Sequence, residues 1–317
     1  MAASGCDSDG MALPVAAGSA PSAGDGHGRD SNLVAVKPLM LGAALLGAAS
    51  ALSAAPAGSG DARGAAPQHI LSVNLCTDQL LLALADRGQI AGLTQNVTDP
   101  GMSAVPALAR GLPLHRGSAE QILAANPDLV VGMPASGSGP LAALPRQHYP
   151  LLDVPPTNRL DDVYHAIART AAAVGHPERG AALIADMQRD LAALPSPGRG
   201  RVGAYYQRRG YMTGTGTLVD DLMTRAGLVN LAAKLGKPPL AQVSIEEMVA
   251  ADPDFLIVES ATDSVTDQGS EMLHHPALEH IPRISIPQAW TVCGGPAYAR
   301  AARSIAAQIA QLDGGGA

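Results

Sequence analysis

The chain has 317 residues, of which 47% are hydrophobic, 15% charged and 3% aromatic. This composition supports a substantial core and excludes a collagen, a disulfide-rich miniprotein and a fully disordered chain. The length suits one large domain or two ordinary ones. The 21 basic residues are outnumbered by 28 acidic ones, giving a formal charge of -7 at pH 7. Because no run of basic residues is present, the sequence argues against a nucleic-acid partner.

The first 57 residues predict export. Residues 1–32 are rich in Gly, Ala, Ser and Asp without periodic apolar positions, so we expect them to be unstructured. Lys37 and the uncharged stretch 38–55, which ends in small residues, have the pattern of a secretory signal peptide rather than of a membrane helix. Because such signals begin at the first residue, we expect translation to start near Leu33 or Val34. The mature protein is then soluble, with no stable membrane insertion.

The next elements in chain order predict alternating strands and helices with short connections. Two helices between residues 160 and 194 separate a first such region from a second. Strands are expected at 70–73, 90–93, 129–131, 151–154, 202–206, 255–258 and 284–286, and helices at 77–85, near 141–147, and at 160–174, 178–194, 218–226, near 271–278 and at 297–312.

An internal repeat indicates that the two regions are similar. Residues 118–131 read SAEQILAANPDLVV and residues 244–257 read SIEEMVAADPDFLI, with six of fourteen positions identical. Each copy opens with a serine that can cap a helix, followed three residues later by Gln121 or Glu247 in the pattern of a capping box. A proline then ends the helix, and an apolar run typical of a buried parallel strand follows.

These patterns predict an α/β fold with two Rossmann-like lobes, each with a central parallel sheet, and a ligand cleft between the lobes. The N-terminal lobe is expected at 68–176 and the C-terminal lobe at 200–313. One long inter-lobe helix at 177–195 joins them. A helix of about 18 residues is roughly 27 Å long and stiff, so we expect small lobe motions.

The order of these motifs resembles one family, the class III periplasmic substrate-binding proteins of ABC importers, which carry ferric siderophores, cobalamin or haem. The resemblance rests on ILSVNLCTDQLL at 70–81, the two repeat units, the long connecting helix, TGTGTLVDDL at 213–222 followed by AGLVN at 226–230, and the late Trp290. It implies a monomeric periplasmic carrier, not an enzyme, with no intrinsic cofactor. Its ligand is expected to be a ferric siderophore or cobalamin, delivered to an importer permease.

In this family an exposed acid on each lobe pairs with arginines of the permease, and the matching positions are Glu120 and Glu246. Both also lie in a first helical turn, where the helix dipole favours a carboxylate by about 0.3 to 1 kcal/mol. The capping box requires only Gln121 and Glu247, however. We therefore expect Glu120 and Glu246 to dock the permease through charge steering.

Ligands of parallel sheets bind beyond the carboxyl ends of the strands, which places the cleft at six loops. These loops are 74–76, 94–96, 133–136, 206–211, 260–263 and 288–293. The predicted ligand-cleft residues are Asn74, Cys76, Met133, Tyr205, Tyr206, Arg208, Tyr211, Trp290 and Cys293. The tyrosines and arginines there suit a large planar or anionic ligand. Strand alternation requires one of Tyr205 and Tyr206 to face the core, but it does not determine which one. Trp290 matches a cleft position by the resemblance, with a core position as the alternative.

Two further features leave alternatives open. Cys76 and Cys293 fall in predicted cleft loops of different lobes and either form a disulfide or remain small buried thiols. His274, His275 and His280 lack the spacing of a zinc site, so no metal ligand is expected. The alternative functions are a two-lobed α/β chelatase-like enzyme, or a protein that binds haem or a free metal ion. The chelatase would need a His/Glu pair that the predicted cleft loops do not supply.

Overall fold

A computed structural model describes residues 65–134, 139–142 and 149–314. The predicted signal peptide and start site lie outside the described residues, as do the ends of the predicted loop 133–136 and of the helix near 141–147. Within the described ranges, no helix combines the length and the apolar character needed to cross a bilayer.

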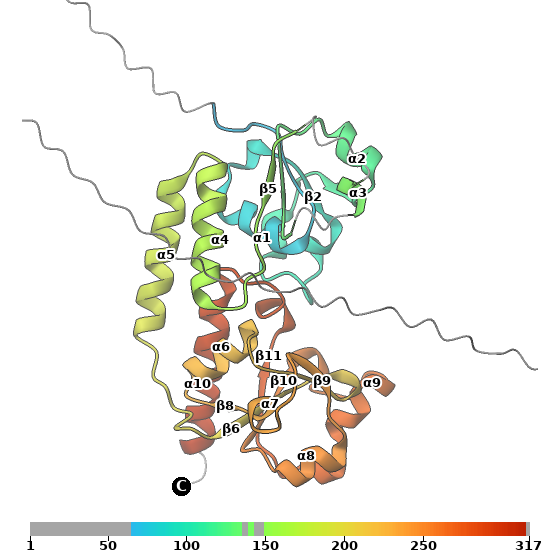
Figure 1. The fold of residues 1–317 in the computed structure, drawn as a ribbon, viewed down its shortest axis with the longest axis vertical. Coiled ribbons are helices and arrows are strands. Elements are labelled where there is room, and N and C mark those ends of the chain that lie inside the picture. The colour runs from blue at the N-terminus through green and yellow to red at the C-terminus, as the bar shows by residue number, and fades with distance from the viewer. Residues whose placement is uncertain (1–64, 135–138, 143–148, 315–317) are drawn as a thin grey trace, which may run out of the picture. The chain divides into compact units, whose positions relative to one another are not determined.

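The N-terminal lobe is built on a sheet of five parallel strands (Figure 1). Its elements are β1 (Ile70–Ser72), α1 (Leu75–Leu84), β2 (Ile90–Thr94), β3 (Leu114–His115), α2 (Ala119–Ala124), β4 (Leu129–Gly132), α3 (Gly139–Ala142), β5 (Leu151–Asp153) and α4 (Leu160–Ala173). The strand order is β3-β2-β1-β4-β5. The central strands β1 and β4 are buried throughout, which explains their continuous apolar runs. The parallel order brings the carboxyl ends of all five strands to one edge.

The C-terminal lobe has a mixed sheet. Its elements are β6 (Val202–Tyr206), β7 (Tyr211–Thr213), α6 (Leu218–Arg225), β8 (Val229–Asn230), α7 (Leu231–Lys234), β9 (Leu240–Gln242), α8 (Ile245–Ala251), β10 (Phe255–Glu259), α9 (Gln268–Glu271), β11 (Arg283–Ile286) and α10 (Ala297–Gly314). The strand order is β11-β10-β6-β7-β9, and β8 pairs with β6. Strands β11, β10, β6 and β8 pair in parallel, whereas β7 is antiparallel to both β6 and β9.

The α/β fold with two central sheets of parallel strands is confirmed, and the second sheet departs from the parallel order at the pairings of β7. The chain reverses between β6 and β7 through a short turn at Arg208–Gly210, where Arg209 has φ 60° and Gly210 has φ 74°. Two successive residues with positive φ allow the tight reversal that a hairpin requires. The predicted helix near 271–278 was wrong: it is divided into α9 and two single 3₁₀ turns, and Pro276 begins the second turn.

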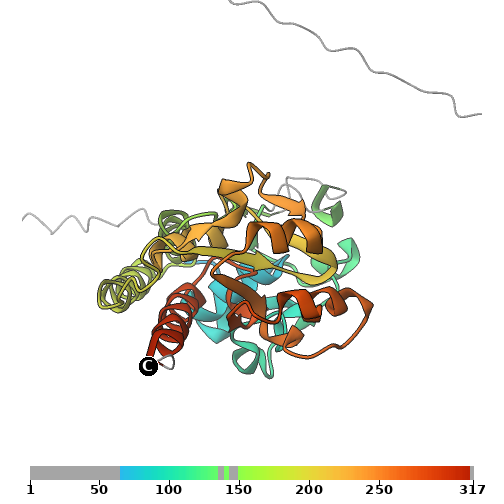
Figure 2. The ribbon, with the colours of Figure 1, turned by 90° about the horizontal axis from the view of Figure 1, so that it is seen from below.

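Helix α5 (Pro177–Ala192) follows α4 and packs beside it, as Figures 1 and 2 both show. The close approach depends on Gly180, where an added Cβ would lie 2.5 Å from the Cβ of Ala171. Helix α5 also contacts α10, and Arg303 forms an ion pair of 2.8 Å with Asp190. Helix α5 is therefore not an isolated rod, because it packs against α4 and against α10.

The largest core cluster contains apolar side chains that cover both sheets. It includes Leu81 of α1, Val163 of α4, Leu222 of α6 and Ile305 of α10, each fully buried. Because this apolar surface is shared, separating the two lobes would expose it to water at a cost of roughly 25 cal/mol per Å². Small lobe motions stay a prediction, for which the shared core adds a physical reason.

The two repeat units fold as helices with serine caps. The hydroxyl of Ser118 accepts from the N–H of Gln121 at 3.3 Å, and that of Ser244 accepts from the N–H of Glu247 at 3.2 Å. The return bond expected for a capping box has been replaced in both copies. Gln121 Oε1 accepts from the N–H of Arg116 at 2.9 Å, and Glu247 forms an ion pair with a lysine side chain. The side chain of Gln121 therefore holds the loop that precedes its own helix.

Candidate ligand-binding site

A cavity of about 510 Å³ lies at the carboxyl ends of β1, β2, β3 and β4. We call it the chelate cavity, after the ligand class that the sequence resemblance implies. This volume falls within the range of small-molecule sites, and the position is the one that parallel sheets use for ligands. It is lined by Val73, Asn74, Leu75, Cys76, Thr94, Gln95, Asn96, Met102, His115, Arg116, Gly117, Met133, Val292 and Cys293.

Asn74 fixes two of the loops that line the cavity. Its Oδ1 accepts from the N–H of Thr77 at 3.0 Å and so caps α1. Its Nδ2 donates to the carbonyl of Met133 at 2.9 Å. The hydroxyls of Thr77 and Ser72 share a further hydrogen bond of 2.7 Å beneath the loop. The ends of β1 and β4 are therefore held together by the polar residues that follow β1.

A buried carboxyl group fixes the end of β2. Asp78 Oδ1 accepts from the N–H of Thr94 at 3.1 Å, and Oδ2 accepts from the hydroxyl of the same threonine. The Asp78 side chain is fully buried. Burial raises the pKa of Asp78 to about 6, although hydrogen bonds with Ser72 and Thr94 act in the opposite direction. The cavity wall at Thr94 thus depends on a carboxyl group that changes charge in weakly acidic solution.

His115 and Arg116 supply the wall at β3. The Nε2 atom of His115 lies 2.7 Å from the carbonyl oxygen of Ser72, and its Nδ1 accepts from the N–H of Gly117 at 3.0 Å. Accepting at Nδ1 requires a neutral ring with its proton on Nε2, where it donates to Ser72. Both ring nitrogens are therefore occupied. Arg116 is exposed, and its backbone is held by Gln121 of α2.

The prediction missed this wall. A strand of two residues, Leu114–His115, is too short to produce a periodic pattern. The sequence signal that could have indicated this loop is Gly117, a turn residue between a basic residue and the serine cap of α2. Its φ is 85°, in the region that favours glycine.

The lining favours a ligand with hydrogen-bonding groups on its periphery. Asn74, Gln95 and Asn96 offer side-chain amides, Thr94 offers a hydroxyl that Asp78 already binds, and Arg116 offers a guanidinium. Met102 and Met133 add two adaptable thioethers. These lining residues include no acidic side chain and no Phe, Tyr or Trp. The lining itself therefore places no carboxylate directly against a bound oxygen acceptor or negative charge.

Tyr205 and Tyr206 are both buried, which corrects their predicted position in the cleft. Tyr205 is 1% exposed, and its hydroxyl lies 3.3 Å from that of Thr291. Tyr206 is 0% exposed, and its hydroxyl donates to the carbonyl of Val243 at 2.9 Å. Both enter the core because β6 is covered on both faces, so that alternation leads to two different apolar clusters. Burial raises the pKa of both phenols.

Cys293 lines the chelate cavity as predicted, whereas three other predicted residues of the C-terminal lobe, Arg208, Tyr211 and Trp290, do not. Arg208 forms an ion pair with Asp267 at the start of α9. Tyr211, the first residue of β7, is 38% exposed. Trp290 is half-buried against the core, with the Arg300 guanidinium 5.7 Å from its ring centroid. The arginine that lines the cavity is therefore Arg116 of the N-terminal lobe and not the predicted Arg208.

Cys76 and Cys293 form a disulfide, with 5.2 Å between their Cα atoms. Of the two alternatives left open by the sequence, the structure has the bridge. Beside it lies a second cavity of about 260 Å³. This second cavity is lined by Cys76, Met133, Pro156, Thr157, Asn158, Leu218, Thr291, Val292, Cys293 and Gly294.

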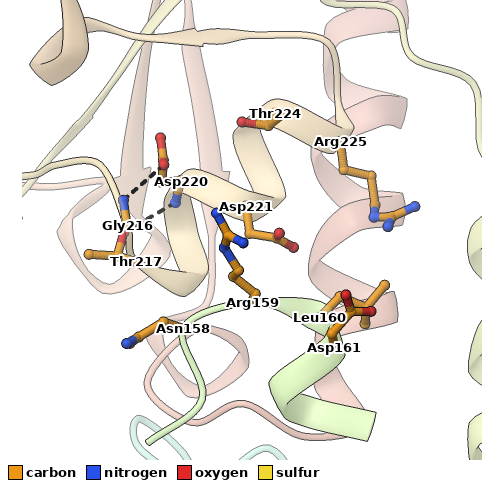
Figure 3. A pocket seen from close by; sticks show the side chains of 10 residues that line it. All are labelled: Asn158, Arg159, Leu160, Asp161, Gly216, Thr217, Asp220, Asp221, Thr224 and Arg225. Carbon is orange, nitrogen blue, oxygen red and sulfur yellow. Dashed lines mark hydrogen bonds between the residues drawn. The ribbon is translucent and has the colours of Figure 1, made fainter. Parts of the chain in front are cut away.

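A third cavity, of about 310 Å³, lies between the start of α4 and α6 (Figure 3). Two of its acidic groups have protein partners: Asp220 accepts from the N–H of Gly216 at 3.0 Å, and Asp221 accepts from the hydroxyl of Tyr298. The Arg225 side chain donates to the same tyrosine at 3.3 Å. These groups therefore support the cap of α6 and its contact with α10.

Glu120 and Glu246 occupy equivalent positions in the two repeat units. Each lies in the first turn of its helix, α2 or α8, and is exposed. Hydrogen bonds with the backbone and with the capping serine hold the pKa of each carboxyl below its ordinary value. Both residues therefore present a negative charge to solvent at neutral pH.

A comparison with protein families matches residues 70–284 to the family described as periplasmic binding protein. This match covers more than half of the chain, so the chain belongs to the periplasmic binding protein family. Proteins of this family bind solutes and are not enzymes, as the sequence resemblance implied. A search of curated proteins found no match.

Solved structures confirm the class III fold. The periplasmic heme-binding protein RhuT from Roseiflexus sp. RS-1 is 26% identical, with a TM-score of 0.62 over 77% of this chain and 98% of that one. The vitamin B12 binding protein BtuF of Vibrio cholerae is 17% identical, with a TM-score of 0.59 over 78% and 98%. An ABC-type Fe3+-hydroxamate transport protein from Saccharomonospora viridis is 20% identical, with a TM-score of 0.56 over 77% and 93%.

Proposed function

We propose that this chain is the periplasmic solute-binding component of an ABC importer and that it captures a metal chelate, either a ferric siderophore or cobalamin. The observation that carries the proposal is the chelate cavity, whose lining combines side-chain amides with one exposed arginine. Among similar proteins of known structure, one belongs to an Fe3+-hydroxamate transport system and one is a vitamin B12 binding protein, which supports a ligand of this class.

The lining supports a chelate with a polar periphery. Hydroxamate and carboxylate siderophores present oxygen acceptors, and Asn74, Gln95 and Asn96 can donate to them. The guanidinium of Arg116 can bind a carboxylate through two parallel hydrogen bonds. Cobalamin presents amide side chains. Their carbonyl oxygens can accept from the same donors, and their N–H groups can donate to the side-chain carbonyl oxygens of Asn74, Gln95 and Asn96.

Haem is the second candidate, because the 26% identical structure is that of a heme-binding protein. The lining does not favour it. The described lining residues include no Phe, Tyr or Trp ring on which a porphyrin could stack. His115, the lining residue best suited to bind iron, has both ring nitrogens in hydrogen bonds. Haem would therefore have to use a methionine of the cavity as its ligand.

Isothermal titration of the purified protein with ferrichrome, a ferric citrate complex, cyanocobalamin and haemin tests the proposed ligand class. We expect one-to-one binding of a siderophore or of cobalamin without turnover. Replacing Arg116 by glutamine should weaken the citrate complex by about 10-fold or more, as expected for a charge-assisted hydrogen bond, and should leave uncharged ferrichrome nearly unaffected. Binding of haemin alone, with an intense Soret band, would refute the siderophore and cobalamin proposal.

We further propose that Glu120 and Glu246 dock the importer permease. Their equivalent places in two repeat units and their exposure support a pair of contacts, one from each lobe. Chelate uptake should be lost in cells whose protein carries E120K together with E246K, while the dissociation constant of the chelate stays unchanged. The matched control reverses Glu178 and Asp186, two exposed acids of α5. Equal loss of uptake in both double variants, or a loss of chelate affinity, would contradict the docking role.

A further inference from the structure

The disulfide joins the two lobes in the wall of the chelate cavity. Cys76 lies in the first turn of α1, and Cys293 lies between the 3₁₀ turn Gln288–Trp290 and α10. The two cysteines are 217 positions apart in the sequence. The bridge therefore fixes the loop after β1 in one lobe against the loop before α10 in the other.

The bridge is part of a wall that two cavities share. Cys76, Met133, Val292 and Cys293 line both the chelate cavity and the second cavity. We call these four residues the partition. Residues 133 and 292 have flexible or small apolar side chains, whereas the disulfide is attached covalently to two backbones. Of the partition residues, only the disulfide lacks the freedom to rotate out of the way.

The lobes also touch directly beside the partition. Gly294 approaches Thr157 so closely that an added Cβ would lie 2.0 Å from the threonine hydroxyl and 2.5 Å from its Cβ. Thr157 belongs to the segment between β5 and α4, and Gly294 follows the disulfide-bonded Cys293. This glycine directly follows the bridge, and the second cavity is bordered by the same contact.

We propose that the disulfide determines specificity by keeping the two cavities separate, and so weakens the binding of larger chelates relative to compact ones. This inference rests on the proposed function, because it names a chelate as the ligand. With the bridge intact, a ligand has the 510 Å³ space beside the N-terminal lobe. Without the bridge, the two cysteine side chains move apart and the 260 Å³ space becomes continuous with it.

The test compares wild-type protein with the variant C76S/C293S, which replaces the bridge by two small hydroxyl side chains. Dissociation constants are measured by calorimetry for ferrichrome, a compact chelate, and for cyanocobalamin, a larger one. We expect the affinity for cyanocobalamin relative to ferrichrome to rise by about 10-fold or more in the variant. Wild-type protein that is reduced with dithiothreitol should show the same change, and reoxidation should reverse it. An unchanged ratio would overturn the inference.

A second measurement does not require a chelate. Amide hydrogen exchange of segments 74–76, 157–158 and 291–294 should be about 10-fold faster or more in the variant, because their positions depend on the bridge. Segments inside α4 and α10 serve as the reference for correct folding. Equal exchange rates in variant and wild type would overturn the inference that the disulfide holds the partition in place. If wild-type protein binds neither chelate, the proposed function fails, and the exchange rates still decide whether the disulfide holds the partition in place.

Discussion

Asp78 allows a direct test of how the wall of the chelate cavity is stabilised. The carboxyl has an ordinary pKa of 3.8, and burial raises it to about 6 in the folded protein. Between these values the folded chain binds more protons than the unfolded chain, so the free energy of unfolding must fall as the pH rises from about 4 to about 6. A difference of about 2 pKa units corresponds to roughly 3 kcal/mol. This contribution is fully lost above the folded pKa.

The variant D78N should lack this dependence. An asparagine can still accept from the N–H of Thr94 and donate to its hydroxyl, so the two hydrogen bonds have replacements. Urea unfolding followed by circular dichroism at pH 4, 5, 6 and 7 should therefore show the stability of D78N rising relative to wild type by about 3 kcal/mol across the series. D186N, which removes an exposed carboxylate, controls for the loss of one charge. A constant difference between D78N and wild type would refute the role assigned to burial.

Two further predictions concern the junction of the lobes. Removing the disulfide in C76S/C293S should lower the free energy of unfolding by up to about 5 kcal/mol, because the bridge closes a loop of 217 residues; urea unfolding measures this change. The variant G294A should lower the melting temperature, since its Cβ would overlap the Thr157 side chain and overpacking costs about 1 to 3 kcal/mol. Adding T157G should restore most of that loss.

Each of these two predictions has a contradicting result. Equal unfolding free energies for wild type and C76S/C293S under oxidising conditions would mean that the bridge does not constrain the unfolded chain. Additive losses in G294A and T157G, with no recovery in the double variant, would mean that the two residues are not in contact, because contacting residues show coupling energies of about 0.5 to 3 kcal/mol.

Much of the fold could be predicted because its signals are local. The strand at 202–206 and the helix starting at 160 have the predicted bounds, since a continuous apolar run and a 3.6-residue period mark them. The serine caps of α2 and α8 were also predictable, because a serine at the start of an amphipathic segment binds its own helix.

The site was harder to predict because it depends on contacts between distant segments. Strand alternation indicates that Tyr205 and Tyr206 point to opposite faces, but not that both faces of β6 are covered. The partner of Arg208 is Asp267, which lies 59 positions later in the chain. Arg116 was missed because the strand before it has only two residues. The pairing of Cys76 with Cys293 likewise becomes evident only when both lobes are in place.

The long separation of the two cysteines also dictates an order of events during biogenesis. Cys76 is synthesised with the first helix, whereas Cys293 precedes the last helix, α10. The thiol of Cys76 must therefore stay unpaired until nearly the whole polypeptide has been made. During that interval it is open to oxidation or to pairing with other thiols. An oxidant that acts only after both globules have met would yield the native bridge, and premature oxidation would trap misfolded species.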